Sequence, residues 1–287
     1  MTKMAIHLKF GLTSVNSGYN SYPERMALIA KAAEKAGFDS IWAGGHPFLS
    51  EKQTLMPPSL RMLDPIVALT FVAAHTRKVR LGTGILLLPQ FNPVIAAKQL
   101  ASLDVLSEGR LTVGIGVGWS EHEYQVLGIP YQDRGSRADD YLKAMKALWG
   151  QDKPIYHGKF VSFDGLQANP RPVQQPNPPI VIGGVSEEAY RRAVRHGNGW
   201  FGVGLDLEGT KRAIAGLREA AGKYSRPAEL GELEITVAPK VPVTKATAQQ
   251  FSELGVHRLN LLTPQDADVT LVERFIETTG STLIGEA

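Results

Sequence analysis

Short apolar runs rich in β-branched residues alternate with longer segments of helical period along most of the chain, and this alternation constrains the fold most. We predict strands at 6–12, 39–44, 79–87, 111–117, 180–183, 200–203, 234–238 and 258–262. We predict helices at 23–36, 64–75, 93–106, 121–127, 137–149, 186–196, 207–223, 246–254 and 268–278. Eight strand–helix alternations favour one parallel (β/α)8 barrel, the TIM barrel of the α/β class, over an open sheet.

Two segments interrupt this rhythm and are predicted to be insertions. Residues 46–63 form a long irregular stretch after the second strand. Residues 151–178, before the fifth strand, are rich in Pro, Gln, Asn and Gly, and we interpret them as a hairpin excursion with extended pieces at 159–163 and 166–168. No shift in composition marks a domain boundary. The 287 residues therefore predict one domain, 1–287, rather than two.

Charge and cysteine content exclude several classes of protein. The chain has no cysteine, which removes disulfides, thiolate metal sites and cysteine nucleophiles together. The net charge of +3 comes from scattered basic residues, without the density of a nucleic-acid footprint. No apolar run approaches the ~20 residues of a membrane span, and the first residues lack the pattern of a signal peptide. We expect a cytoplasmic protein that acts on a small molecule, without nucleic-acid or membrane partners.

The 29 glycines exceed the typical share of ~7% and gather at the carboxyl ends of the second to fifth strands. They are Gly44, Gly45, Gly82, Gly84, Gly114, Gly116, Gly118, Gly183 and Gly184. In a TIM barrel this rim holds the active site. Glycine permits positive φ or a close approach of a ligand to the backbone. We interpret the set as the bed of a large flat ligand; each glycine alone could instead end a strand before a turn.

Several familiar motifs fail on residue identity. The dinucleotide fingerprint that starts at Gly114 would need glycine where Trp119 stands. A nucleophile elbow that starts at Gly118 would need glycine where His122 stands. The P-loop and the H-E-x-x-H pattern are absent from the sequence. A nicotinamide Rossmann enzyme, a serine hydrolase and a zinc protease are thereby excluded, and we expect no metal site.

The GGVS segment, 183–186, ends an apolar strand and opens a helix. Ser186 is predicted to cap this helix, and free N–H groups at a helix start beside two glycines favour an anion. We therefore predict a phosphate cradle here, with Glu187 and Glu188 pointing outward because they would repel the anion. The alternative is an ordinary capped helix after a turn.

His46 follows the second strand and is predicted to lie on the catalytic rim, where it could donate to a ring carbonyl or act as acid and base. The alternative is a histidine that fixes the following loop. The segments 46–63 and 151–178 could roof a substrate cavity. The residues that we expect to line it are Trp42, Phe48, Met56 and Trp119.

At these residues the sequence resembles the bacterial luciferase-like family of flavin- and deazaflavin-dependent oxidoreductases. The strings that carry the resemblance are DSIWAGGH (39–46), VRLGTGILLLPQFNPVIAAKQLASLDVLSEGRLTVGIGVGW (79–119) and PIVIGGVSEEAYRRAVRHGNGW (179–200). It covers most of residues 8–200 and the last strands weakly. Within the family the chain is most similar to the small members that use the deazaflavin coenzyme F420.

This resemblance implies a barrel whose strand ends hold the ring of the cofactor. It implies a bulge in the third strand with a non-prolyl cis peptide at Gly84–Ile85, His46 as the catalytic residue, and a homodimer through the second and third helices. The cofactor-binding residues that follow are His46, Thr83, Gly84, Ile85, Gly118, Trp119, His122, Gly183, Gly184, Val185 and Ser186.

The sequence also departs from parts of the family. Trp119 stands where the sugar-phosphate dehydrogenases have a catalytic glutamate, and Gly45 stands where other members have aspartate before the histidine. A sugar phosphate is therefore not expected as substrate. We expect hydride transfer between reduced F420 and an apolar organic substrate. The alternatives are an FMN-dependent monooxygenase that uses reduced flavin and O2, and a non-catalytic flavin-binding barrel.

Overall fold

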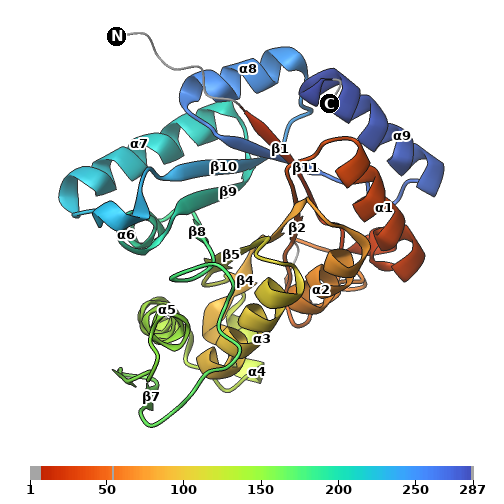
Figure 1. Ribbon diagram of the computed structural model, residues 1–287. Coiled ribbons are helices and arrows are strands. Elements are labelled where there is room, and N and C mark those ends of the chain that lie inside the picture. The colour runs from red at the N-terminus through yellow and green to blue at the C-terminus, as the bar shows by residue number, and fades with distance from the viewer. Residues whose placement is uncertain (1–7, 54, 286–287) are drawn as a thin grey trace.

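The computed structural model describes residues 8–53 and 55–285 and shows a closed parallel barrel wrapped by helices (Figure 1). The barrel strands are β1 (Lys9–Thr13), β2 (Ser40–Ala43), β3 (Arg80–Thr83), β4 (Leu86–Leu87), β5 (Leu111–Gly116), β8 (Ile180–Gly183), β9 (Gly199–Leu205), β10 (Glu234–Pro239) and β11 (Arg258–Leu262). Their order around the barrel is β3-β2-β1-β11-β10-β9-β8-β5-β4, and pairing of β3 with β5 closes the ring. The predicted TIM barrel is confirmed.

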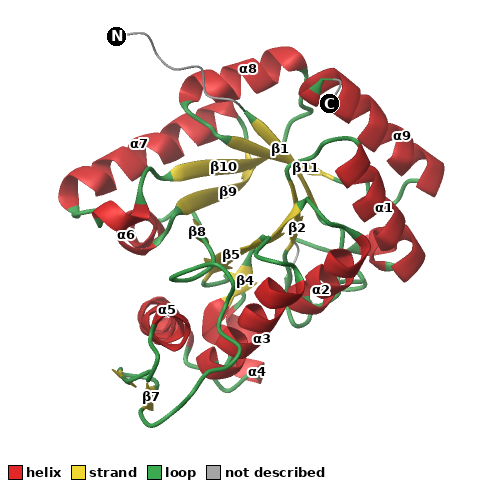
Figure 2. Ribbon diagram, in the orientation of Figure 1, coloured by secondary structure: helices red, strands yellow, loops and turns green. Residues whose placement is uncertain are grey.

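Helices follow the strands and form the outer layer (Figure 2). They are α1 (Pro23–Lys35), α2 (Pro65–His75), α3 (Pro93–Leu106), α4 (Glu121–Val126), α5 (Arg134–Gly150), α6 (Glu187–His196), α7 (Leu207–Lys223), α8 (Lys245–Leu254) and α9 (Val269–Thr279). Short 3-10 helices span Gly18–Ser21, Leu88–Gln90, Tyr131–Asp133 and Ala228–Leu230, and a π-helix spans Gly280–Ile284. None of the helices in the described ranges is long and apolar enough to cross a membrane.

Local sequence signals explain where several helices begin. Proline occupies the first position of α1, α2 and α3, where its missing N–H costs nothing and its fixed φ suits a helix. Asp64 caps α2 by accepting the backbone N–H groups of Ile66 and Val67, and Asn92 caps α3 in the same way. These signals lie within the predicted segments, and the helix ends agree with the predictions to within a few residues.

The strand predicted at 79–87 is wrong as one continuous element. It is divided into β3 and β4, and the peptide bond between Gly84 and Ile85 at the break is cis. The break places Ile85 off the line of the strand, while β4 pairs again with the last residues of β5. The expected bulge and cis peptide are therefore present. The strand predicted at 6–12 begins at Lys9 in the structure, and its residues 6 and 7 lie outside the described ones.

The excursion at 151–178 contains a hairpin, but its strands differ from the predicted ones. β6 (Tyr156–His157) pairs antiparallel with β7 (Ser162–Phe163), and 166–168 is not a strand. The position of the hairpin is set by Asp140 of α5. Its carboxylate accepts the hydroxyl of Tyr156 at 2.6 Å and the backbone N–H of Phe160 at 2.8 Å. The register of this hairpin therefore depends on its contacts with Asp140 of α5. No local sequence pattern reveals such a contact.

The interior of the barrel has an apolar upper part and a charged base. Trp42 and Phe201 pack against each other beneath the carboxyl-terminal rim, with ring centroids 5.4 Å apart. At the opposite end Arg258 forms an ion pair with Asp39 at 2.8 Å and a second with Glu234. Burial alone would raise the pKa of the Glu234 carboxyl, but the charges of Arg258 and Lys9 outweigh it and the net shift is downward. The base is therefore closed by ion pairs, and ligand access is left to the rim.

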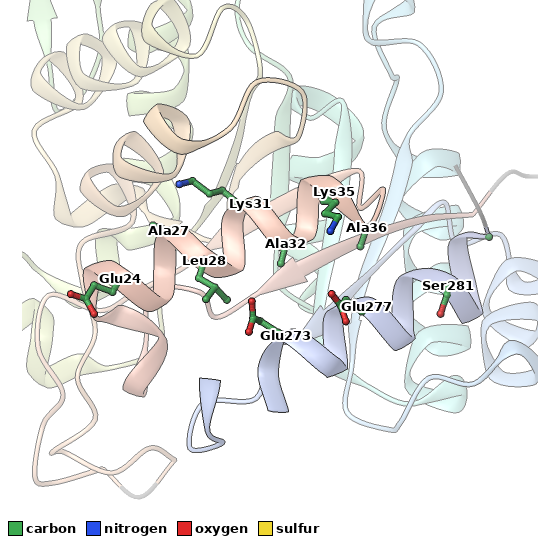
Figure 3. Close-up of a pocket in the computed structure, with 11 residues that line it drawn as sticks. Glu24, Ala27, Leu28, Lys31, Ala32, Lys35, Ala36, Glu273, Glu277 and Ser281 are labelled. Carbon is green, nitrogen blue, oxygen red and sulfur yellow. The ribbon is translucent and has the colours of Figure 1, made fainter. Parts of the chain in front are cut away.

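An outer groove of about 770 Å³ runs between α1 and α9. Leu28 and Ala32 of α1 face Glu273 and Glu277 of α9 across it (Figure 3). This groove lies in the helical layer, away from the strand ends.

Candidate functional site

A hydrogen-bonded pair of ionisable side chains lies at the carboxyl-terminal rim. His46 follows β2, and its Nδ1 is 2.6 Å from Oε1 of Glu123 in α4. The His46 side chain is 12% exposed and that of Glu123 only 1%. A carboxylate accepts hydrogen bonds, so Nδ1 of His46 carries the proton of this contact. Within the described part of the chain, Nε2 of His46 has no hydrogen-bond partner.

Glu123 is held by two further groups. The amide Nε2 of Gln90 donates to Glu123 Oε2 at 2.8 Å, and Ser120 caps α4 by accepting the backbone N–H of Glu123. Neither Glu123 nor Gln90 was predicted as a site residue. The S-x-x-E spacing of Ser120 and Glu123 is a signal that could have placed Glu123 in the first turn of a helix on the rim. No sequence signal joins it to His46, which is 77 positions away in the chain.

Trp119 and His122, both predicted as site residues, lie in different surroundings. The ring of Trp119 lies 5.3 Å from the ring of His46, and Trp119 is 39% exposed. His122 instead faces the segment 46–63, where its Nδ1 lies 2.7 Å from the hydroxyl of Ser50 and its ring meets Phe48 edge-on at 6.1 Å. The structure thus brings Trp119 beside His46 and places His122 against the insertion loop.

The floor of the barrel mouth is formed by the Gly84–Ile85 segment. The side chain of Ile85 lies between Gly116 and Gly183, because a Cβ on either glycine would collide with it. Thr83 and Trp42 lie below this floor and are at most 1% exposed. The Thr83 hydroxyl donates to the carbonyl of Gly114 at 2.7 Å. The side chain of Thr83 therefore belongs to the barrel interior, although it was expected to contact a ring.

The interpretation of the rim glycines needs a correction. A Cβ on Gly82 would collide with the ring of Trp42, one on Gly114 with the carbonyl of Thr83, and one on Gly44 with the carbonyl of Gly84. These glycines make room for the protein's own Trp42 and for the interrupted strand, not for a ligand. Gly118 and Gly184 differ, because they adopt φ of +69° and +120°, which disfavours any side chain.

The predicted phosphate cradle has the expected local geometry. Ser186 caps α6 by accepting the backbone N–H of Ala189 at 3.2 Å, and Val185 is 58% exposed. The backbone N–H groups of Val185 and Ser186 have no acceptor among the described residues. The carbonyl of Gly184 is turned inward, where it accepts the indole N–H of Trp200 at 2.7 Å. The start of α6 therefore offers N–H groups to an anion.

Glu187 and Glu188 lie in the first turn of α6 and are exposed to solvent. The backbone N–H of Glu188 and the hydroxyl of Ser186 lower the pKa of the Glu188 carboxyl. A surface carboxylate there stabilises the positive end of the helix. Its negative charge also opposes the binding of another anion at this helix start.

The structure does not gather the four residues that were expected to line a substrate pocket. Trp42 is 1% exposed and packs in the barrel core, because it lies beneath the Gly84 segment. Phe48 packs on His122, and Met56 lines a separate groove. A cavity of about 210 Å³ instead lies beside His46, between Met62, Gln90 and Phe91. The described residues contain no group of three or more metal-ligating side chains.

Comparison with known proteins identifies the family. The model of the luciferase-like monooxygenase family matches residues 5–265, and the chain therefore belongs to this family. An uncharacterised protein of Mycobacterium tuberculosis is 31% identical over 263 residues, which cover 87% of this chain and 89% of that protein. The FMNH2-dependent dimethylsulfone monooxygenase of Pseudomonas putida is 32% identical over 168 residues, 58% of this chain and 46% of that protein.

A solved structure shows the same fold over nearly the whole chain. It is the coenzyme F420-dependent tetrahydromethanopterin reductase of Methanopyrus kandleri, with a TM-score of 0.78 and 16% identity. The match covers 96% of this chain and 98% of the reductase. The chain is thus a luciferase-like TIM barrel. One of its relatives is an FMNH2-dependent monooxygenase, and a protein with the same fold is an F420-dependent reductase.

Proposed function

We propose that this protein is an F420-dependent oxidoreductase that transfers hydride between the reduced deazaflavin and an organic substrate. The observation that carries the proposal is the His46–Glu123 pair beside the exposed Trp119, above the floor formed by Ile85. Hydride transfer to a carbonyl carbon requires a proton for its oxygen, and the reverse reaction requires a base for that proton. A rim histidine held by a buried carboxylate performs either role.

The residues present fit a ring cofactor with a phosphate. When bound, the deazaflavin would supply the hydride, while the protein supplies position and electrostatics. Ile85, framed by Gly116 and Gly183, forms the bed for a flat ring, and Trp119 forms a wall on the side of His46. The N–H groups of Val185 and Ser186 would hold the phosphate at the start of α6.

His46 has the defined role of holding and moving a proton at Nε2. The hydrogen bond from Nδ1 to Glu123 fixes the tautomer and stabilises the imidazolium that forms when Nε2 takes up a proton. Gln90 holds the second oxygen of the carboxylate, so the pair cannot rotate freely. Three side chains therefore position this proton. They are His46 after β2, Gln90 in the 3-10 helix after β4, and Glu123 in α4.

The second candidate is an FMN-dependent monooxygenase. The identity of 32% to the FMNH2-dependent enzyme of Pseudomonas putida favours it. The same ring bed and phosphate cradle would serve FMN.

Equilibrium titration of the purified protein with F420 and with FMN, each followed by fluorescence, tests the proposal. We expect F420 to bind more tightly. Tighter binding of FMN, together with O2 consumption when reduced FMN is supplied, would overturn the proposal in favour of the monooxygenase.

A further inference from the structure

A second groove opens on the rim beside the site described above. It measures about 680 Å³ and lies between the loop after β1, the end of the segment 46–63 and the loop after β11. Its walls include Tyr19, Tyr22, Arg61 and Met62. Tyr19 and Tyr22 are 55% and 48% exposed, and their rings stack with centroids 6.2 Å apart. Two large exposed rings beside an arginine are the composition of a site that binds flat ligands.

Arg61 is fixed in this groove by three separate contacts. Its backbone carbonyl accepts the N–H of Gly18 at 2.8 Å, and its Nε donates to the hydroxyl of Ser21 at 2.8 Å. Its guanidinium lies 4.7 Å from the ring centroid of Tyr22. The loop that carries it is tied down further, because Met62 forms a β-bridge with Ser17.

The guanidinium of Arg61 is fixed without a counter-ion. No ion pair to Arg61 and no hydrogen bond from its two terminal nitrogens occurs within residues 8–53 and 55–285. The one acidic side chain in the groove wall is Asp266, whereas Arg25 adds a second cation 5.9 Å from the ring of Tyr19. A planar guanidinium that is held in place with its terminal N–H groups free matches the two oxygens of a carboxylate.

Met62 joins this groove to the catalytic pair. Its side chain lines both the groove and the cavity beside His46, and its sulfur accepts the backbone N–H of His46 at 3.4 Å. The groove that holds Arg61 and the cavity beside His46 therefore share Met62 as a common wall residue. A ligand held by Arg61 would extend past Met62 toward the barrel mouth.

From this arrangement we propose that the groove is the recognition site for the carboxylate of a flat organic acid, which is the substrate class of the enzyme. The carboxylate binds the terminal nitrogens of Arg61, and the apolar body of the acid lies against Tyr19 and Tyr22. The part of the proposal that calls this acid a substrate rests on the proposed function. The binding of the acid in the groove does not depend on the proposed function.

A titration of the cofactor-free protein tests the groove by itself. Benzoate is the probe, and benzamide, which has the same shape without the charge, is its matched control. Calorimetry should show that benzoate binds more tightly than benzamide and that added salt weakens this binding. The Arg61→Met variant should lose at least about tenfold in affinity for benzoate, whereas Arg61→Lys should retain part of it.

The Arg218→Met variant removes an exposed arginine of α7 and serves as the control. Circular dichroism shows whether each variant is folded. Equal affinities for benzoate and benzamide, unchanged benzoate affinity in Arg61→Met, or no saturable benzoate binding would overturn the proposal. Because no cofactor is present, failure of F420 to bind would leave this result intact, and the two proposals fail separately.

Discussion

At the scale of single residues, His46 and Glu123 are 77 positions apart in the sequence but form a hydrogen bond in the structure. Glu123 touches neither the barrel mouth nor solvent, so we assign it as a positioning residue that acts through His46. Its carboxylate fixes which nitrogen of His46 carries the proton. This role predicts that a change of charge at Glu123 alters turnover more than cofactor binding.

The Glu123→Gln substitution tests this role while keeping the shape of the side chain. We expect kcat to fall by about tenfold to a hundredfold, because the imidazolium of His46 loses its negative partner. Cofactor affinity should stay unchanged, since Glu123 does not face the ring bed. Glu121→Gln, which removes an exposed charge from the same turn of α4, is the control. A parallel loss of cofactor affinity and turnover would indicate a structural role instead.

A second prediction at this scale concerns the packing of Ile85. In Gly116→Ala the new methyl group collides with Cδ1 of Ile85, so we expect a loss of about 1–3 kcal/mol in the free energy of unfolding and weaker cofactor binding. The double variant Gly116→Ala/Ile85→Ala should recover much of the loss, because it removes the colliding atom. Urea unfolding and cofactor titration measure both effects. Additive losses in the double variant would contradict the assigned contact.

At the scale of elements, the start of α6 combines two opposing requirements. The helix is stabilised by a carboxylate in its first turn, whereas the neighbouring N–H groups of Val185 and Ser186 are the proposed phosphate site. The backbone N–H of Glu188 and the Ser186 hydroxyl lower the pKa of the Glu188 carboxyl, which is therefore held in its charged form. A bound phosphate would therefore lie close to the negative charge of Glu188.

Glu188→Gln should accordingly strengthen binding of the phosphate-bearing cofactor by about twofold to fivefold. The gain should be lost at high salt, because the site is exposed to solvent. Glu187→Gln, one residue earlier in the same turn, provides the comparison. Titration of both variants at low and high ionic strength measures the effect. Weaker binding to Glu188→Gln would contradict the placement of the phosphate at α6.

At the scale of the whole molecule, part of the pH dependence of stability follows from a partly buried histidine at the end of α6, His196. Burial, together with the charges of Lys146, Arg195 and Lys143, lowers the pKa of His196 from 6.5 to about 4, against the opposing charge of Asp139. The unfolded chain takes up a proton near 6.5 and the folded chain does not. His196 therefore favours the folded state fully above 6.5, and this contribution is lost as the pH falls toward about 4.

We expect the free energy of unfolding to decline over this interval and the decline to be shallower in His196→Asn. Urea unfolding at several pH values measures the difference between the two proteins. His157→Asn, in the exposed hairpin, should leave the pH profile of the parent unchanged. Identical profiles for the parent and His196→Asn would show that this histidine is not kept neutral by the fold.

The remaining prediction concerns the outer surface of the molecule. A homodimer is expected to form through the second and third helices, α2 and α3. α2 and α3 pack side by side and expose Val67 at 65% and Ile95 at 57% (Figure 1). We expect sedimentation to show a dimer that Val67→Arg together with Ile95→Arg converts to a monomer, because buried cations destabilise an apolar interface. Leu271→Arg on α9 should not change the assembly. A monomeric parent protein would contradict this prediction.

The barrel, most helix boundaries and the glycine-serine turn before α6 could be predicted from the sequence, because they depend on local periodicity, proline and capping residues. Ser186 acts as the predicted cap, and the interruption at Gly84–Ile85 was expected from the family resemblance. Trp42 was expected to line a substrate pocket and Thr83 to contact a ring, and both side chains are buried in the structure. The alternation of residues along a strand does not show which side chain points into the barrel when the strand is interrupted. Trp42 and Thr83 both lie beneath the floor formed by Gly84 and Ile85.

The sequence by itself determined the class of fold, the family and the place of His46 on the rim, since each follows from the pattern of neighbouring residues. Only the tertiary structure decided which side chains meet. Closure of the barrel brings Glu123 to His46, fills the space beside the rim glycines with Trp42 and Ile85, and stacks Arg61 on Tyr22. The physical reason is that such contacts depend on strand register and on the angle at which each element leaves the barrel, which are settled when the whole ring closes.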